Sequence, residues 1–461
     1  MSGERLASVY ARLPTGAQHA AVTAYGAWWR WLRFGPGYKA EVRRYESREQ
    51  WTAERWRDWQ DIRVAEVLTA AIARVPQYRD AWDGEQRKAA GRGELDGVPV
   101  LEKHTLADHP DRLLDPQARP RRPLVFSTSG SSGTPVSTHW TVPELRSSLA
   151  VREVRSARWA GVSFTLPRVT FSGRMIEPRS DGRSTPHRYN AAEHQVYLSA
   201  FHLTPETAPD YLSAIARHGS QWGTGYASSF RQLARYTVDG GLDAPKLTAV
   251  VTTSEKTSNE TRELVQAAFG CRTFEEYSSV ENSALATECV AGSLHVSPDV
   301  GLIEIVRADG TACDPGEVGD VVTTTLMRRF QPLIRYRLGD RAAWAEDDGC
   351  ACGREMPVLS EVVGRLEDEL VGADGRRLTR IDQVFRELPG VHEGQIVQHR
   401  PGDFTVRVMA DERFDGDAAA TLAQRIRDRL GDVIVRVTTD EALERTPSGK
   451  VKFVVDRSPT Q

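Results

Sequence analysis

One stretch organises this sequence: Val125-Phe-Ser-Thr-Ser-Gly-Ser-Ser-Gly-Thr-Pro-Val136. It places eight consecutive hydroxyl or glycine residues between an apolar, strand-like lead and a proline. Glycines let the backbone turn sharply enough for several N–H groups to face one anion, and the hydroxyl groups add further donors. A flexible Ser/Gly linker has a similar composition, so the stretch alone predicts either a phosphate-binding loop or a linker. The candidate phosphate-binding residues are Thr128, Ser129, Gly130, Ser131, Ser132, Gly133 and Thr134.

Three distant stretches decide between these alternatives. They are Glu276-Tyr-Ser-Ser-Val-Glu281, Arg335-Tyr-Arg-Leu-Gly-Asp340 followed by Gly364-Arg365, and Arg445-Thr-Pro-Ser-Gly-Lys450. Together and in this order, the four stretches resemble the adenylate-forming (AMP-binding) ligase superfamily. The spacing and the cysteines are most similar to its phenylacetate–CoA ligase and CapK-like capsule-biosynthesis branch. Four motifs in order over residues 128–450 are far more specific than one Ser/Gly loop.

The resemblance implies an α/β fold with two domains. Residues 1–365 would form a large N-terminal adenylating domain of α/β layers with a β-rich subdomain, beginning with a helical segment over residues 1–90. Residues 366–461 would form a small, mobile C-terminal α+β lobe that carries the catalytic lysine, with Glu367 at the hinge. The sequence pattern agrees, because strands and helices alternate through the middle of the chain before strands and hairpins take over.

Composition excludes several functional classes. The 461 residues are 40% hydrophobic and carry a net charge of −3, which gives no basic field for nucleic acid. The N-terminus has no charged-then-apolar leader, and the uncharged run from Leu13 to Trp29 is too rich in Gly, Ala and Thr to span a bilayer. Five widely spread cysteines do not suggest a disulfide framework. We therefore expect a cytoplasmic protein with no transmembrane segment and no nucleic-acid partner.

Two segments carry weaker local signals. The helix expected over residues 20–32 contains Trp28, Trp29 and Trp31, flanked by arginines. We expect these aromatic side chains to pack on the main domain, and contact with a membrane surface is the alternative. Residues 168–193 are rich in Arg, Ser and Pro, so we expect a loop that faces solvent or the substrate.

Adenylation of a carboxylic acid requires control of charge, because the carboxylate must approach the negative α-phosphate of ATP. Glu281 is expected to bind Mg²⁺, both by its own chemistry and by the resemblance. The resemblance implies that Tyr277 stacks on adenine, that Asp340 binds the ribose hydroxyls and that Arg365 reaches the ribose or phosphate. Lys450, on a Pro/Gly turn, would lie between the substrate carboxylate and the α-phosphate. Each residue alone is better explained by a surface, core or turn position, but jointly these explanations become improbable.

Further site residues follow from the same resemblance. Ser254 and Glu255, which close a buried strand, are expected to contact the nucleotide or the substrate. Tyr226 and Ser228 are expected to line the acyl pocket, with core packing and helix capping as the alternatives. The expected cofactor-binding set is completed by Glu276 and Ser278.

A structural zinc ion is expected at Cys289, His295, Cys350 and Cys352. Three thiolates and one imidazole suit tetrahedral Zn²⁺, and four protein ligands leave no open position for catalysis. Similar positions in the phenylacetate–CoA ligase branch support this reading, while ordinary buried thiols are the alternative. The other two cysteines, Cys271 and Cys313, would remain free.

These residues predict an AMP-forming carboxylic acid ligase that uses ATP and Mg²⁺ to form an acyl-adenylate and then transfers the acyl group to coenzyme A. An amine acceptor, which would give an amide, is the first alternative, because no thiol-channel signature is present. A nucleotide-binding protein without turnover is the second alternative. The presence of both Glu281 and Lys450 argues against it.

Overall fold

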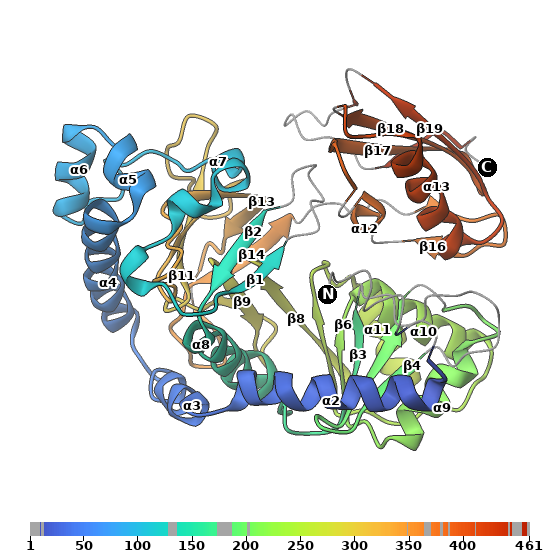
Figure 1. The fold of residues 1–461 in the computed structure, drawn as a ribbon. Helices are drawn as coiled ribbons and strands as arrows, with labels where there is room; N and C mark the ends of the chain where they lie inside the picture. The colour runs from blue at the N-terminus through green and yellow to red at the C-terminus, as the bar shows by residue number, and fades with distance from the viewer. Residues whose placement is uncertain are drawn as a thin grey trace.

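The computed structural model describes residues 10, 13–127, 136–172, 187–200, 203–347, 349–363, 370–378, 381–385, 388–410, 412–440, 443–444 and 454–458. Its mixed α/β architecture, with one large sheet and flanking helices, confirms the predicted fold class (Figure 1).

Helices make up the described N-terminal part of the chain. Thr52 caps the longest of them by accepting a hydrogen bond from the Arg55 N–H at 3.3 Å. That helix ends before Pro76, which lacks the N–H needed to continue it and starts the next helix instead. The helices and short 3-10 turns before the first strand are α2 (Thr15–Phe34), α3 (Tyr38–Glu46), α4 (Ala53–Arg74), α5 (Pro76–Ala81), α6 (Gly84–Gly91), α7 (Lys103–Asp108), η1 (Pro110–Leu113) and η2 (Pro116–Ala118).

The aromatic side chains of α2 are not packed on the main domain as a group, so that expectation was wrong. Tyr25, Trp28 and Trp31 are 54%, 51% and 60% exposed. Of the three tryptophans, only Trp29 turns toward the body of the protein, where its ring lies edge-on to Phe126 with 6.3 Å between the ring centroids. The physical reason is that α2 directs its polar side chains inward, toward the edge of the large sheet.

The large sheet contains strands β3 (Arg168–Ser172), β4 (His187–Asn190), β5 (Gln195–Ser199), β6 (Trp222–Gly225), β7 (Ala249–Thr253), β8 (Arg272–Ser278), β9 (Leu285–Glu288), β10 (Leu294–Val296), β11 (Gly301–Val306), β12 (Gly319–Thr325), β13 (Tyr336–Trp344) and β14 (Val358–Val363). Their spatial order is β11-β12-β13-β14-β10-β9-β8-β7-β6-β3-β5-β4. The strands in the run β5-β3-β6-β7-β8 are parallel to their neighbours within it, whereas every other neighbouring pair is antiparallel.

Helices pack beside the parallel strands. They are α8 (Val142–Arg152), continued by η3 (Glu153–Ala157) and η4 (Arg158–Ala160), then α9 (Ala208–Arg217), α10 (Ala227–Asp239) and α11 (Asn259–Phe269). Phe230 of α10 and Val265 of α11 are fully buried in one core with Val169, Val196 and Val250 of the sheet. This β/α arrangement follows from parallel strands, which need crossover helices to connect them.

Residues 168–193 were expected to form a loop, but strands β3 and β4 lie at their two ends. Val169 and Phe171 are buried in the sheet. Arg168 is buried as well, because its guanidinium donates to Gln195 at 2.7 Å and to the Phe164 carbonyl at 2.8 Å. Arginines with such partners are tolerated inside the fold, so the polar composition of this segment concealed its strands.

The predicted phosphate-binding stretch is bracketed by a small antiparallel sheet. Strand β1 (Leu124–Ser127) pairs with β2 (Ser137–Trp140), with Ser127 opposite Ser137. Residues 128–135 themselves lie outside the described part of the chain.

The C-terminal residues form sheets of their own. A hairpin of β15 (Leu370–Val371) and β16 (Arg377–Leu378) precedes the short helix α12 (Asp382–Phe385). The following sheet has the order β19-β18-β17-β20 and packs on one helix. Its elements are β17 (Val391–Arg400), β18 (Asp403–Ala410), α13 (Gly416–Leu430), β19 (Ile434–Thr439) and β20 (Val454–Asp456).

A buried ion-pair network ties the N-terminal helices to the large sheet. Arg155 of η3 and Asp299, which precedes β11, both have fully buried side chains and lie 2.6 Å apart. Arg155 also pairs with Glu49 at 3.0 Å, and Arg48 approaches Asp299 at 3.1 Å. Although burial alone would raise the pKa of Asp299, the two arginines hold that pKa below its ordinary value.

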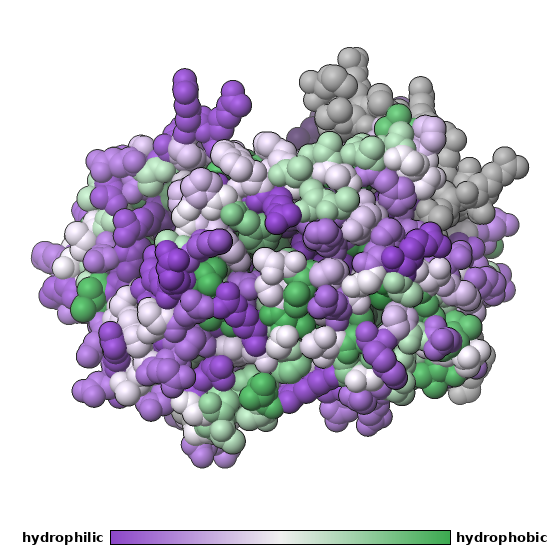
Figure 2. Space-filling view, turned by 90° about the horizontal axis from the view of Figure 1, so that it is seen from below, coloured by the Kyte–Doolittle hydropathy of each residue, from purple (hydrophilic) through white to green (hydrophobic). Residues whose placement is uncertain are grey.

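Hydropathy across the surface is mixed. Figure 2, which views the molecule from below, shows mainly hydrophilic side chains with hydrophobic ones in small separate groups. Among the described residues, the helices include none that is both long enough and apolar enough to cross a bilayer.

Candidate functional site

Three neighbouring parallel strands deliver predicted site residues to one edge of the large sheet. Tyr226 follows β6, Ser254 follows β7, and Tyr277 lies near the end of β8. The strand register places Gly225 opposite Thr252 and Thr253 opposite Glu276, so the three strand ends are level. The carboxyl edge of parallel strands is where open α/β sheets bind ligands. Ser254 has φ +71°, a left-handed conformation that is uncommon for serine and typical of a tight functional turn.

Residues from distant parts of the chain meet at this edge. The hydroxyl of Tyr277 donates to Oδ2 of Asp340, on β13, at 3.0 Å. Both side chains are only partly buried, so they remain accessible to a ligand. The predicted adenine-stacking residue and the predicted ribose-binding residue are thus in direct contact.

Glu281 follows β8 and is held by the same distant strand. Its carboxylate accepts a hydrogen bond from the Tyr336 hydroxyl at 3.2 Å, and its backbone carbonyl accepts one from Arg328 at 2.9 Å. Glu281, Tyr336 and Arg328 are 4%, 0% and 0% exposed. Arg328 also donates to the carbonyl of His139 on β2, which links Glu281 to the strand after the predicted phosphate loop. Burial lowers the pKa of Arg328 to about 10.

Glu276 faces a different environment from its neighbours. Its carboxylate accepts hydrogen bonds from Arg152 of α8 at 3.1 Å, from the Ser156 hydroxyl, and from the Ser278 hydroxyl at 2.9 Å. Glu276 is buried, and these donors hold it against the helix. A contact between Glu276 and a nucleotide would therefore have to come from its backbone.

Sequence reasoning missed Tyr336 and Arg328 as part of this site. Tyr336 lies inside a quoted motif, Arg335-Tyr-Arg-Leu-Gly-Asp340, and that position was the available signal. No local pattern identifies Arg328, because its role depends on the packing of β2 and the segment after β8.

Comparison with known proteins connects this geometry to a family. No protein-family model matches the chain. The chain is 21% identical to protein CapK of Staphylococcus aureus over 368 residues, which are 78% of this chain and 80% of CapK. It is 25% identical to phenylacetate–coenzyme A ligase of Thermus thermophilus over 455 residues, 87% of this chain and 97% of the ligase. Both similarities agree with the resemblance to the adenylate-forming ligase superfamily that the four motifs predicted.

Solved structures agree on the fold. The chain superimposes on 2-hydroxyisobutyryl-CoA ligase, in complex with 2-HIB-AMP and CoA in its thioesterification state, with a TM-score of 0.58 at 20% identity. The match covers 89% of this chain and 91% of that ligase. This match shows the fold, and together with the two relatives it confirms the resemblance to adenylate-forming ligases that was predicted from four motifs.

Several residues that the adenylate-forming resemblance implicates lie outside the described part of the chain. For Ser228, the structure gives only its position in the first turn of α10. Glu255 follows Ser254 and is partly buried at the same sheet edge. The residues that stay predictions without a described position are Thr128 to Thr134, Arg365, Glu367 and Lys450.

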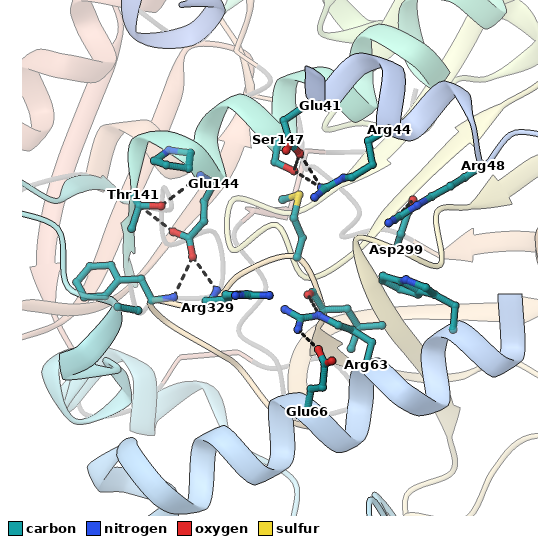
Figure 3. Close-up of a pocket in the computed structure, with 16 residues that line it drawn as sticks. Glu41, Arg44, Arg48, Arg63, Glu66, Thr141, Glu144, Ser147, Asp299 and Arg329 are labelled. Atoms are coloured by element: carbon teal, nitrogen blue, oxygen red, sulfur yellow. Dashed lines mark hydrogen bonds and ion pairs between the residues drawn. The ribbon is translucent and has the colours of Figure 1, made fainter. Parts of the chain in front are cut away.

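A cavity of about 500 Å³ lies elsewhere, between α3, α4, α8 and residues 326–330 (Figure 3). Four arginines and four acidic residues line it, and Arg44 pairs with Glu41 at 2.6 Å and Arg63 with Glu66 at 2.5 Å. None of the described residues predicted to bind nucleotide or substrate lines this cavity. The described residues that were predicted to bind nucleotide or substrate therefore lie at the sheet edge, away from this cavity.

The predicted zinc ligands come together in the structure. The ligand atoms of Cys289, His295, Cys350 and Cys352 all lie within 4.8 Å of one another. Sγ of Cys289 is 3.6 Å from Sγ of Cys350, close to the roughly 3.8 Å that tetrahedral Zn–S bonds of about 2.3 Å require. Nδ1 of His295 is 3.0 Å from the Met356 carbonyl, which leaves Nε2, 3.3 Å from Sγ of Cys352, to face a metal.

The surroundings of Cys350 favour its thiolate form, which is the form that binds a metal. Although partial burial opposes it, hydrogen bonds from Ser293, from the Cys352 backbone and from His295 lower the pKa of Cys350 to about 6. Burial raises the pKa of Cys289. Cys271 and Cys313 lie outside the cluster, as expected, and are unbonded to other cysteines.

Proposed function

We propose that this chain is an AMP-forming ligase that activates a carboxylic acid with ATP and transfers the acyl group to coenzyme A. One observation carries the proposal: Tyr277 and Asp340, which the resemblance implies bind adenine and ribose, are hydrogen-bonded at the carboxyl edge of the parallel strands. The relatives support it, because one is a phenylacetate–coenzyme A ligase and a protein of the same fold holds an acyl-adenylate and CoA.

Each residue has a definite task in this reaction. Glu281, oriented by Tyr336, would hold the Mg²⁺ that offsets the charge of the phosphates. Lys450 would lie between the substrate carboxylate and the α-phosphate. A carboxylate oxygen attacks the α-phosphorus and pyrophosphate leaves, so the acyl group becomes bonded to AMP. The thiol of coenzyme A then attacks the acyl carbon, the thioester forms and AMP leaves. Tyr226 would border the acyl group, since it follows β6, which pairs with the strand that precedes Ser254.

The decisive experiment measures pyrophosphate release by purified protein with ATP, Mg²⁺ and a panel of aryl and alkyl acids. We expect release with at least one acid, and AMP together with an acyl-CoA product when coenzyme A is added. Product formation with an amine but not with coenzyme A would instead identify an amide-forming ligase. ATP binding without release of pyrophosphate with any acid would leave only a nucleotide-binding protein.

We further propose a structural Zn²⁺ at Cys289, His295, Cys350 and Cys352, supported by the donor set and by the distances between its atoms. Trp56 and Trp159 pack around the cluster, so the ion would hold α4, η4 and the antiparallel strands together. The division into domains of residues 1–365 and 366–461, with a pivot at Glu367, is likewise part of this proposal.

A further inference from the structure

The outward face of α2 is composed almost entirely of small and aromatic residues. A surface helix normally presents charged and polar side chains to solvent. Here Arg30 is the single charged residue on that face, and the large aromatics Tyr25, Trp28 and Trp31 are each more than half exposed. The exposed residues of α2 are Gly16, Ala17, Ala20, Ala24, Tyr25, Ala27, Trp28, Arg30 and Trp31.

The inward face of α2 is polar because it covers the edge of the large sheet. Strand β4 is the last strand of that sheet, and it has backbone N–H groups on its open side. Nδ1 of His19 accepts the N–H of Tyr189 at 2.9 Å, and Oγ1 of Thr23 accepts the N–H of Ala191 at 3.2 Å. Arg33 forms an ion pair with Glu193 on the same side. With its polar residues engaged here, α2, which runs along the lower part of the molecule in Figure 1, leaves small and aromatic residues exposed.

The exposed aromatic side chains form a continuous group. The rings of Tyr25 and Trp28 lie 5.5 Å apart between centroids, and those of Trp28 and Trp29 lie 5.6 Å apart. Trp31 continues the group toward α8, where the guanidinium carbon of Arg146 is 5.8 Å from its ring. Tryptophan and tyrosine are the residues enriched where proteins meet the headgroup region of a bilayer.

The segment that contains α2 carries only basic charges. Residues 13–40 contain no Asp or Glu, although the whole chain carries a net charge of −3. Arg33 pairs with Glu193 on the inward side, so the charges left for the outward side are Arg30 and Lys39, together with Arg146 beside Trp31. This local excess of positive charge complements an anionic lipid surface.

We propose that the outward face of α2 lies on the surface of an anionic lipid bilayer, with the rings of Tyr25, Trp28 and Trp31 at the level of the headgroups. Shallow contact suits the helix, because its alanines contribute little apolar area and its aromatics contribute most. The association is peripheral and reversible, and it does not depend on the reaction proposed above.

Flotation with lipid vesicles tests this proposal. Vesicles of phosphatidylcholine with phosphatidylglycerol should carry the wild-type protein upward in a density gradient, vesicles of phosphatidylcholine alone should carry less, and added salt should reduce the difference. The double variant Trp28→Gln/Trp31→Gln should partition at least about tenfold less, given the apolar area that two indole rings remove from water. The matched control is Ile62→Gln on α4, which changes a side chain that is 65% exposed and should float like the wild type.

Three results would overturn the proposal. The first is no flotation of folded wild-type protein with anionic vesicles, and the second is equal flotation of the double variant. The third is a wild-type dimer in light scattering that becomes monomeric in the double variant without any lipid binding, which would identify α2 as an interface between copies of the chain. Unchanged thermal unfolding of the variants checks that these exposed substitutions leave the fold intact.

Discussion

Replacing Tyr336 by phenylalanine removes one hydroxyl from the proposed metal site and little else. That hydroxyl donates to Oε1 of Glu281 at 3.2 Å, and both residues are buried. Phenylalanine keeps the ring and its packing in the core. The substitution therefore tests the orientation of the Glu281 carboxylate while leaving that carboxylate in place.

The size of the effect follows from the kind of hydrogen bond that is lost. A hydrogen bond to a charged group contributes about 1.5–3 kcal/mol to stability. Mutation of a group that is hydrogen-bonded to a metal ligand typically lowers metal affinity by about 10- to 100-fold. We therefore expect Tyr336→Phe to raise the Mg²⁺ concentration needed for half-maximal pyrophosphate release by at least about tenfold. The free energy of unfolding should fall by about 1.5 kcal/mol or more, because the Glu281 carboxylate loses a donor.

Tyr78→Phe is the matched control. Tyr78 lies in the same core, and its hydroxyl donates to the Pro332 carbonyl at 2.9 Å and accepts the Ile334 N–H at 3.1 Å. Its removal should destabilise the fold by a similar amount without altering the Mg²⁺ requirement. Equal changes in the Mg²⁺ requirement of both variants would show that a general loosening of the fold is the cause, and not the lost hydrogen bond to Glu281. An unchanged or lower requirement in Tyr336→Phe would refute the orienting role of the hydroxyl.

Four further predictions follow from the proposed site and its supports. Glu281→Gln should abolish adenylation while the fold persists, and unchanged pyrophosphate release at limiting Mg²⁺ would contradict its assignment as a ligand. Lys450→Ala should slow adenylation by on the order of 10²-fold while sparing transfer from a supplied acyl-adenylate, so equal losses in both steps would mean a structural role. Asp299→Asn should lower the free energy of unfolding by about 3 kcal/mol near neutral pH. Burial would raise the pKa of Asp299, but the neighbouring arginines hold it below the ordinary carboxyl value. The stability that the charged Asp299 contributes is therefore complete above the ordinary carboxyl pKa and is lost as pH falls through the lower pKa of the folded protein. The free energies of unfolding of wild type and variant, measured by chemical denaturation, should converge in acid. Metal analysis should find about one zinc per chain in the wild type and none in Cys352→Ser, and metal-free, well-folded wild type would exclude the site.

Local sequence signals were sufficient to predict an element where the residues that begin and end it are adjacent to it in sequence. The sequence pattern over residues 259–269 predicts a helix, and α11 has those bounds because the Ser258 side chain accepts the Thr261 N–H and Gly270 ends the helix at φ +67°. The pattern over residues 301–306 predicts a strand, and β11 has those bounds. The same reasoning located Ser254 and Tyr277 at strand ends, since a buried strand followed by polar residues marks the edge of a parallel sheet.

Long-range packing explains what local signals did not reveal. Strand β3 contains Arg168, whose burial depends on Gln195 and on the Phe164 carbonyl, and no residue near Arg168 in sequence indicates the Gln195 contact. The exposed tryptophans of α2 follow from the position of β4 at the sheet edge, which determines which face of the helix turns inward. Tyr336 acquires its role because β13 returns to Glu281, which lies 55 positions earlier in the chain.

The return of β13 to β8 requires strong curvature of the sheet. In the strand order, β14, β10 and β9 separate the two strands, which is roughly 19 Å along a flat sheet with a spacing of about 4.8 Å. Yet Tyr277 on β8 and Asp340 on β13 are 3.0 Å apart, so the antiparallel strands must curl over the end of β8.

The Cys/His cluster lies on the strands that make this curve. Cys289 and His295 belong to the β9–β10 hairpin, and Cys350 and Cys352 belong to the connection from β13 to β14. An ion bound there would cross-link the segments between Tyr277 and Asp340, the proposed adenine-stacking and ribose-binding residues, while touching neither. Loss of such a metal should therefore weaken nucleotide binding as well as stability, because the curvature between the two halves of the proposed nucleotide site sets the distance between them. Titration of ATP into protein before and after chelation measures this coupling, and an unchanged affinity after complete metal removal would show that the curvature is maintained by packing alone.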